Sequence, residues 1–298
     1  MKIRDVAVVP LGAIPLEEVS DLALAGAAGS TLVVAVGDRA ACVVWARIDD
    51  GPQGLVWTVE PLPGDTLSSS GASQLEGVAS DGAGGILLVA EWPNRAVLVD
   101  APSRTVVGAV DLVLPEAGEF GALGRSWLDA AGSHAEGVLM LRDGHLLIVK
   151  EKDPAGLLEF APRGAAPTGF GPDTWLADGE RWQLPAQGPL ELVAAWLPDA
   201  ELAGLCPDLS AVAEGPEGTL LLLSDQGASV ARIPGMQPAA KPLAGVISAT
   251  AGWRLTGLRG KPEGIAVLPA GDVLIACDRK KAKGNLFLVP AGSWLVDG

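Results

Sequence analysis

The sequence contains no tyrosine, only two histidines and only three cysteines in 298 residues. Cys42, Cys206 and Cys277 are far apart and form no CxxC pair, so neither a cysteine zinc site nor a disulfide framework is expected. Basic residues are few as well, because 21 Lys and Arg stand against 36 Asp and Glu, a net charge of −15. Since Lys and Arg supply the affinity for phosphates, this balance argues against nucleic acid or a membrane surface as the main partner.

Long apolar runs are also absent. No window reaches the roughly 18 apolar residues of a membrane span, and residues 1–15 lack the apolar core and cleavage site of a signal peptide. We therefore expect a cytoplasmic protein, although an exported chain trimmed of its signal would look the same. The GxSxG, HExxH and P-loop motifs are missing. Glycine and proline, in contrast, are in excess: the 39 Gly and 23 Pro favour a fold with many strands and turns.

One sequence unit recurs along the chain. An apolar run is followed by a turn rich in Gly, Asp or Pro and by a second apolar run that ends in an acid, a pattern typical of a β-hairpin. The clear copies are LEGVASDGAGGILLVAE (75–91), AEGVLMLRDGHLLIVKE (135–151), LSAVAEGPEGTLLLLSD (209–225) and PEGIAVLPAGDVLIACD (262–278). A weaker copy with a longer turn is VSDLALAGAAGSTLVVAVGD (19–38).

Further short apolar runs follow each hairpin, so one unit holds about four antiparallel strands. Four-stranded sheets repeated around an axis are the blades of a β-propeller. We predict an all-β fold over residues 1–298 as one domain, with five blades from five motifs and six as the alternative. The N-terminal run IRDVAVVPL is predicted to supply the outer strand of the last blade and close the ring. Segments 113–134 and 163–208 are predicted insertions.

The meander order places two columns of residues on one face of the disc. The residues that begin each inner strand share this face with the acids that end each second strand, and we assign both insertions to it. The inner column is Ser20, Glu76, Glu136, Ser210 and Glu263, and the second is Asp38, Glu91, Glu151, Asp225 and Asp278. Carboxylates crowded near one axis raise one another's pKa or hold a cation.

Two interpretations of these columns stay open. Three Glu carboxylates with the hydroxyls of Ser20 and Ser210 form an all-oxygen set that suits Ca²⁺. Alternatively, the acids accept backbone N–H groups at the strand ends and are architectural.

Basic side chains follow several of the second strands. Arg95, Lys150, Lys152 and Arg279 are candidates to bind a carboxylate or phosphate near a metal, or else they balance nearby acids in solvated loops. His134, which lies on the same predicted face, is a candidate base or ligand, with a plain surface role as the alternative.

The succession of motifs resembles the SdiA-regulated family of bacterial β-propellers, relatives of the NHL-repeat propellers. The order is an EG motif, an EG motif with a KEKDP end, a DLS motif with an LSD end, and a PEGIA motif, between about Val19 and Leu288. The resemblance implies a channel-centred acidic site that binds calcium. The EG placement is also similar to that of propeller lactonases and phosphotriesterases, where a Glu at the start of an inner strand binds catalytic calcium. Those enzymes add Asn and Asp, where this sequence has Glu and Ser.

Three functions follow as hypotheses. The first is a calcium-binding propeller that recognises a small polar or anionic ligand, with the ion held by Glu76, Glu136 and Glu263. The second is a metal-dependent hydrolase of a lactone, ester or phosphoester, with Glu136 or Glu151 as base. Lys150 or Arg279 would then hold the anionic group.

The third is a metal-free scaffold that binds a protein partner. We expect a monomer, because a propeller needs no partner to close its sheets.

Overall fold

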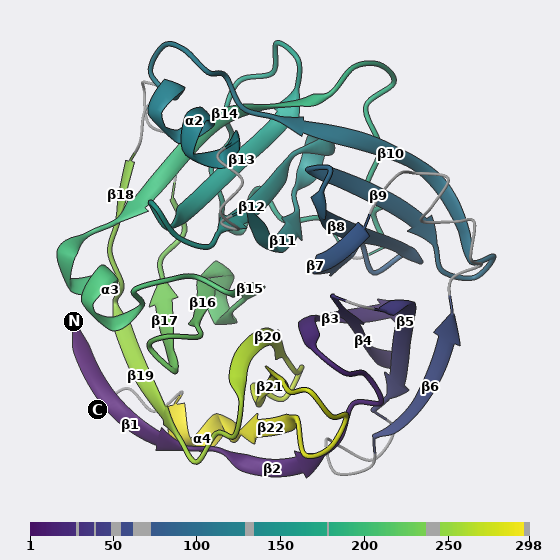
Figure 1. The fold of residues 1–298 in the computed structure, drawn as a ribbon, viewed down its shortest axis with the longest axis vertical. Coiled ribbons are helices and arrows are strands. Elements are labelled where there is room, and N and C mark those ends of the chain that lie inside the picture. Colours follow the sequence, from purple (N-terminus) through teal and green to yellow (C-terminus); the bar gives the residue numbers. More distant parts are fainter. Residues whose placement is uncertain are drawn as a thin grey trace.

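The computed structural model describes residues 1–27, 30–38, 40–48, 55–61, 73–128, 134–177, 179–236 and 245–294. Within these ranges nearly all of the regular secondary structure is strand, and the sheets stand side by side in a ring around a central axis (Figure 1). This arrangement confirms the predicted β-propeller fold.

The described strands form four-stranded units, here called blades and numbered in chain order from the first inner strand. Blade 1 is β3 (Val19–Ala27), β4 (Ser30–Gly37), β5 (Ala40–Arg47) and β6 (Val56–Pro61). Blade 2 is β7 (Ser73–Ser80), β8 (Gly85–Trp92), β9 (Arg95–Asp100) and β10 (Thr105–Val113). Blade 3 is β11 (Ala135–Met140), β12 (Leu146–Lys150), β13 (Gly156–Pro162) and β14 (Leu190–Pro198).

The last two blades recruit strands from elsewhere in the chain. Blade 4 is β15 (Ala211–Glu214), β16 (Leu220–Ser224), β17 (Ser229–Ile233) and β19 (Ala251–Thr256). Blade 5 is β20 (Lys261–Val267), β21 (Val273–Asp278), β22 (Leu286–Val289) and the N-terminal strand β2 (Val9–Gly12), which pairs antiparallel with β22. The N-terminal segment therefore closes the last blade, as predicted.

Other elements lie at the outer edges and between blades. Strand β1 (Lys2–Ala7) pairs in parallel with β19 of blade 4, so the N-terminal run contacts two blades, whereas the sequence predicted one. Outer strands β10 and β14 also pair in parallel, and β18 (Gly245–Ile247) adds to β14. The short helices are α2 (Gly121–Leu128), α3 (Ala200–Leu205) and α4 (Ala291–Trp294), with 3₁₀ turns at Arg142–Gly144 and Pro216–Gly218.

The glycine of the EG motif allows neighbouring inner strands to pack closely. A Cβ at Gly77 would lie 2.9 Å from the carbonyl oxygen of Glu136 on the next blade. A Cβ at Gly137 would lie 3.0 Å from the Cα of Ala211, and one at Gly264 would lie 2.8 Å from the backbone nitrogen of Leu22. Each contact crosses to the following blade, and the contact of Gly264 joins blade 5 to blade 1. Close packing between neighbouring blades therefore explains the glycine of the EG motif.

Part of the second predicted insertion, residues 163–189, lies on the face opposite the acids. Residues 113–134 connect blade 2 to blade 3 and hold α2, as expected for the acidic face. Residues 163–189, in contrast, connect β13 to β14 within blade 3, on the face of the hairpin turns. The expectation that both insertions share the acidic face is wrong, because a connection between the third and fourth strands of a meander lies at the opposite end. The remainder of segment 163–208 is β14 followed by the connection with α3, which leads to the inner strand β15 and so returns to the acidic face.

A buried carboxylate anchors this connection to the blade. Glu159 on β13 is fully buried, and its Oε1 accepts hydrogen bonds from His145 Nδ1 at 2.7 Å, Thr168 N at 2.7 Å and Thr168 Oγ1 at 2.9 Å. Its Oε2 accepts one from Gly169 N at 3.0 Å. Four donors thus converge on one side chain.

Glu159→Gln is expected to destabilise the protein by about 1–2 kcal/mol, because the new amide would set a donor against a backbone N–H. Thermal unfolding measures the loss, and amide hydrogen exchange should show faster exchange at Thr168 and Gly169. Glu191→Gln on β14 is the control, because this half-buried side chain loses only one ion pair, with Arg163 at 2.7 Å. Equal exchange at these two amides in both variants would contradict the anchoring role.

No helix in the described ranges is long and apolar enough to cross a membrane.

Candidate functional site

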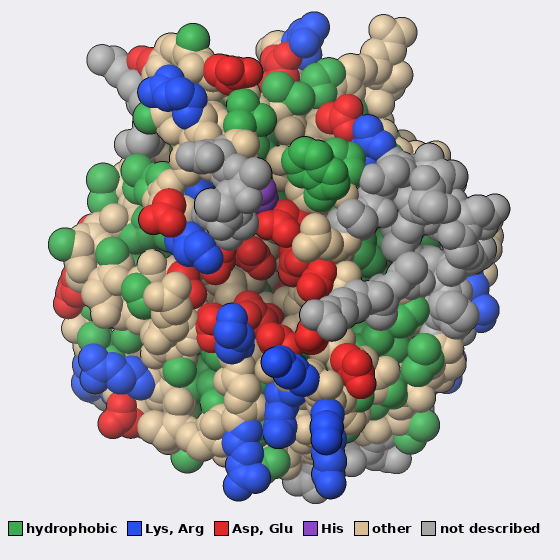
Figure 2. Space-filling model, in the orientation of Figure 1, with side chains coloured by type: hydrophobic (Ala, Val, Ile, Leu, Met, Phe, Trp, Pro, Cys, Tyr) green, Lys and Arg blue, Asp and Glu red, His purple; other side chains and the backbone are tan. Residues whose placement is uncertain are grey.

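The inner column of the sequence prediction forms a ring at one end of the central channel. Glu76, Glu136 and Glu263 extend from the first strands of blades 2, 3 and 5, and Ser20 and Ser210 occupy the same position in blades 1 and 4. Acidic side chains gather over the centre of this face, with Lys and Arg beside them (Figure 2). The repeat places these residues together because every inner strand starts at the same face.

Burial and mutual repulsion raise the pKa values of the three ring carboxyls strongly. Burial raises the pKa of Glu76 from an ordinary 4.5 to about 7, and the charge of Asp38 adds to this rise. Burial likewise raises the pKa of Glu263 to about 9, with repulsion from Asp225 as the next cause. The pKa of Glu136 is raised well above its usual range by burial and by the charge of Glu76. The ring therefore holds protons near neutral pH unless a cation takes their place.

Three of the five acids in the second column lie beside basic side chains. His134 Nδ1 lies 3.0 Å from Glu91 Oε1, and Lys152 Nζ lies 2.7 Å from Glu151 Oε2. Lys261 Nζ lies 3.5 Å from Asp225 Oδ2 and was not among the sequence candidates, although it stands directly before the last EG motif.

Asp21 is the principal residue that the sequence prediction missed. Its side chain is 1% exposed and accepts hydrogen bonds from Leu22 N at 2.8 Å and from Val78 N, on blade 2, at 2.9 Å. The backbone of Ile265 on blade 5 also hydrogen bonds to it, and burial raises its pKa well above the ordinary value. The available signal was position, because Asp21 stands where the EG motifs have glycine. One carboxyl thus joins three blades beside the ring.

Lys150 and His134 are buried at this face. Lys150 is fully buried, its Nζ donates to the carbonyl oxygen of Lys152, and desolvation lowers its pKa to about 8. His134 is 6% exposed and packs edge-on against Trp127 of α2, with ring centroids 5.8 Å apart. The ordinary surface role considered for His134 is therefore wrong.

Arg95 and Arg279 have partners within their own blades. Arg95 forms an ion pair with Asp111 across β9 and β10, at 2.6 Å. Arg279 Nη1 donates to the carbonyl oxygens of Lys283 and Gly284 in its own loop. Both guanidinium groups are therefore engaged by groups of their own blade.

The donor chemistry of the ring suits a hard cation, but the geometry is not preformed. All of its side-chain donors are oxygens, and Ser210 Oγ donates to Pro262 O at 2.8 Å, which leaves its lone pairs as acceptors. Within the described ranges, no three His, Cys, Asp or Glu side chains are already arranged as metal ligands. A bound cation would have to draw the carboxylates inward.

Comparison with known proteins identifies the fold. No known protein family matches the chain, and no curated protein matches it in sequence. Among solved structures, the calcium-binding protein regucalcin from Agrobacterium tumefaciens is similar over 97% of this chain and 95% of its own, with 14% identity and a TM-score of 0.50. Glutaminyl cyclase from Myxococcus xanthus is similar over 96% and 98%, with 13% identity and a TM-score of 0.48. A putative gluconolactonase is similar over 94% and 81%, with 11% identity and a TM-score of 0.47.

The chain is therefore similar to β-propeller proteins, and identities this low show the fold alone. The resemblance to the SdiA-regulated family stays a prediction.

Proposed function

We propose that this chain is a calcium-binding β-propeller that recognises a small polar or anionic ligand at its acidic face. The observation that carries the proposal is the burial of Glu76, Glu136 and Glu263 at one channel end, each with a raised pKa. A divalent ion would supply the positive charge that lets these groups ionise together. The name of regucalcin, a calcium-binding protein, agrees with this assignment.

The basic groups at the rim supply the second half of the proposal. At the outer edge of the ring, Lys152 forms an ion pair with Glu151, and Lys261 forms one with Asp225. A carboxylate or phosphate of a ligand would meet these ammonium groups beside the cation.

Glu263→Gln and Glu76→Gln are each expected to weaken calcium binding at least tenfold at pH 7.5, because each removes one anionic oxygen donor. Isothermal calorimetry with CaCl₂ alone measures the affinity, and Glu191→Gln on the outer strand of blade 3 is the matched control. If both ring variants bind calcium as the unmodified protein does, the assignment is wrong.

One observation favours a metal-dependent hydrolase as a second function. Lys150 has a pKa lowered to about 8 and Glu76 a pKa raised to about 7, so the same face holds two groups that titrate near neutral pH. In this reading Glu136 or Glu151 takes a proton from water. The test is hydrolysis of a simple lactone and of p-nitrophenyl acetate with CaCl₂ or EDTA, and Lys150→Met should remove any calcium-dependent rate. No rate above background with either substrate would leave binding as the function.

A further inference from the structure

Blade 5 concentrates positive charge on the acidic face. Six of the 21 Lys and Arg residues of the chain lie in the connection that leads into β20 and in the loop between β21 and β22: Arg259, Lys261, Arg279, Lys280, Lys281 and Lys283. All of them except Arg279 are exposed. Lys and Arg side chains form a band that extends from the ring of acids across blade 5 toward the edge of the molecule (Figure 2). These six residues are here called the basic strip.

Close backbone packing brings the two segments of the basic strip together. A Cβ at Gly260 would lie 2.6 Å from the carbonyl oxygen of Asp278 and 2.8 Å from Cγ of Arg279. The connection at 259–261 therefore lies directly against the start of the loop at 279–284. The carbonyl oxygen of Arg279 also accepts a hydrogen bond from Glu18 N at 3.1 Å, which joins the loop to the segment before blade 1.

Side-chain hydrogen bonds fix the conformation of the same loop. Arg279 Nη1 donates to the carbonyl oxygens of Lys283 at 2.8 Å and of Gly284 at 3.0 Å, and so closes the loop on itself. Asn285 follows the loop and is fully buried, and its Oδ1 accepts a hydrogen bond from Ile14 N at 2.8 Å. The loop is thus held at both ends before any partner binds.

Most of the exposed cations in the basic strip have no acidic partner. Lys261 forms an ion pair with Asp225 at 3.5 Å, whereas Arg259, Lys280, Lys281 and Lys283 form none with any described residue. Elsewhere, exposed guanidinium groups do pair with acids, since those of Arg163 and Arg181 lie 2.7 and 3.2 Å from carboxylates. Like charges gathered on a fixed loop repel one another, so this arrangement costs stability unless an anionic partner neutralises it.

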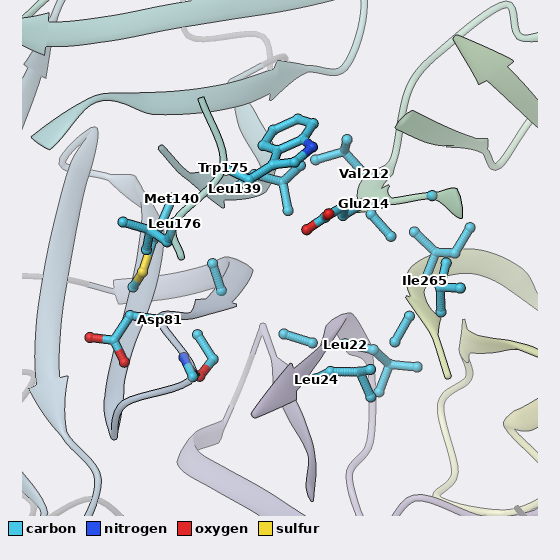
Figure 3. Close-up of a pocket in the computed structure, with 18 of the residues that line it drawn as sticks. Leu22, Leu24, Asp81, Leu139, Met140, Trp175, Leu176, Val212, Glu214 and Ile265 are labelled. Carbon is cyan, nitrogen blue, oxygen red and sulfur yellow. Dashed lines mark hydrogen bonds between the residues drawn. The ribbon is translucent and has the colours of Figure 1, made fainter. Parts of the chain in front are cut away.

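The other end of the channel provides no cation for an anionic partner. The cavity there is lined by the hairpin turns at 80–83, 214–216 and 268–271, and no Lys, Arg or His is among its described lining residues. Its charged groups are the carboxylates of Asp81 and Glu214 (Figure 3). An anionic partner is therefore directed to blade 5 on the acidic face.

The composition of the basic strip favours a chain of carboxylates as its ligand. Arg binds a phosphate through two parallel hydrogen bonds, whereas Lys is a point charge that pairs with one oxygen at a time. The guanidinium of Arg279 is already bound to backbone carbonyls, which leaves mainly Lys side chains. A broad anionic surface, such as a membrane, would also meet the acids beside the band (Figure 2). A narrow chain can follow the band without this repulsion.

We propose that the basic strip docks an extended segment, rich in Asp and Glu, of a partner protein. Its carboxylates pair with Lys280, Lys281 and Lys283 at the outer end of the strip. Lys261, two residues before the ring carboxyl Glu263, forms the inner end. The contact requires no metal, so it does not depend on the calcium proposal.

Fluorescence anisotropy with fluorescein-labelled octaglutamate, in EDTA at pH 7.5, tests the proposal. We expect saturable binding in 50 mM NaCl that unlabelled octaglutamate displaces and that weakens at least about fivefold in 200 mM NaCl, because salt screens exposed charges. Lys280→Gln, Lys281→Gln and Lys283→Gln combined should weaken binding at least about tenfold, since three charge-assisted contacts are lost. The corresponding triple change to Arg keeps the charges and should stay within about threefold.

A matched triple variant separates the basic strip from the net charge of the protein. Lys2→Gln, Arg163→Gln and Arg254→Gln remove three exposed charges outside the strip and should leave the affinity within about twofold. Citrate should compete only at about a hundredfold higher concentration than octaglutamate, because it spans fewer of the cations.

Four results would each overturn the proposal. The first is no saturable binding of octaglutamate in 50 mM NaCl, and the second is an equal loss of affinity in the two Gln variants. The third is citrate that competes as well as octaglutamate, which would make the strip a small-anion site. The fourth is sedimentation with vesicles of equal parts phosphatidylcholine and phosphatidylserine that the change of Lys280, Lys281 and Lys283 to Gln abolishes, which would assign the strip to a membrane surface.

Discussion

In EDTA, the protein is expected to become less stable as the pH rises from 5 to 8. The pKa values of Glu76 and Glu263 are about 7 and 9 in the folded state against an ordinary 4.5, so the folded state binds more protons in this window. Stability then falls with pH, because it rises only where the unfolded chain binds more protons. Integrated over this window, the two shifts amount to about 6 kcal/mol, or roughly 12–24 °C in melting temperature. Above pH 8 the lowered pKa of Lys150 acts in the opposite direction.

Calcium should reverse this loss. Repeating the melts in 5 mM CaCl₂ should raise the melting temperature more at pH 8 than at pH 5, because cation and protons compete for the same carboxyls. Glu263→Gln should flatten the pH dependence in EDTA, since its amide does not titrate. A stability in EDTA that is constant or increases from pH 5 to 8 would show that the ring carboxyls are ionised without a cation.

Asp21→Ala is expected to destabilise the protein by about 4 kcal/mol, or roughly 8–16 °C in melting temperature. The side chain accepts the backbone N–H groups of Leu22 and Val78, and the change would leave both buried and unpaired. The backbone of Ile265 loses its bond as well, so blades 1, 2 and 5 are all affected. Urea and thermal unfolding measure the effect.

Two further variants separate this role from a general loss of charge. Asp21→Asn keeps one acceptor oxygen and resembles the neutral carboxyl that the raised pKa implies, so it should cost only about 1–2 kcal/mol. Asp5→Ala removes an exposed acid on β1 and should be neutral within about 0.5 kcal/mol. If Asp21→Ala were as stable as Asp5→Ala, the three-blade junction would not contribute to stability.

The repeat predicted the propeller and the positions of its inner strands because both depend on local spacing. Each hairpin encodes its own turn, and the position of Glu76 in its copy matches those of Glu136 and Glu263. The location of residues 163–189 was mispredicted because extra length in a repeat does not reveal which connection contains it. The run at 190–198 is apolar like other strands, but the irregular segment before it hid its place in blade 3.

The partners of the site residues could not be predicted in the same way. The contact of His134 with Glu91 and that of Lys261 with Asp225 both join neighbouring blades, and hairpin spacing contains no information on such pairs. Asp21 was overlooked because the alignment of the weak first copy gave weight to Ser20. The aspartate in place of the glycine of the EG motif was the sign that blade 1 contacts its neighbours through a side chain at this position.

The pairing of residues 2–12 with blades 4 and 5 has a consequence for how the molecule is made. Lys2 pairs with Ala251 and Val9 with Leu288, so the two outermost strands of these blades join residues about 250–280 positions apart. Such distant pairing slows folding, because the entropy of closing a long loop is lost before the contact forms. On a ribosome, residues 2–12 emerge long before their partners and must wait with unpaired strand edges. Blades 1 to 3 can assemble during that interval, and closure of the ring is a late event.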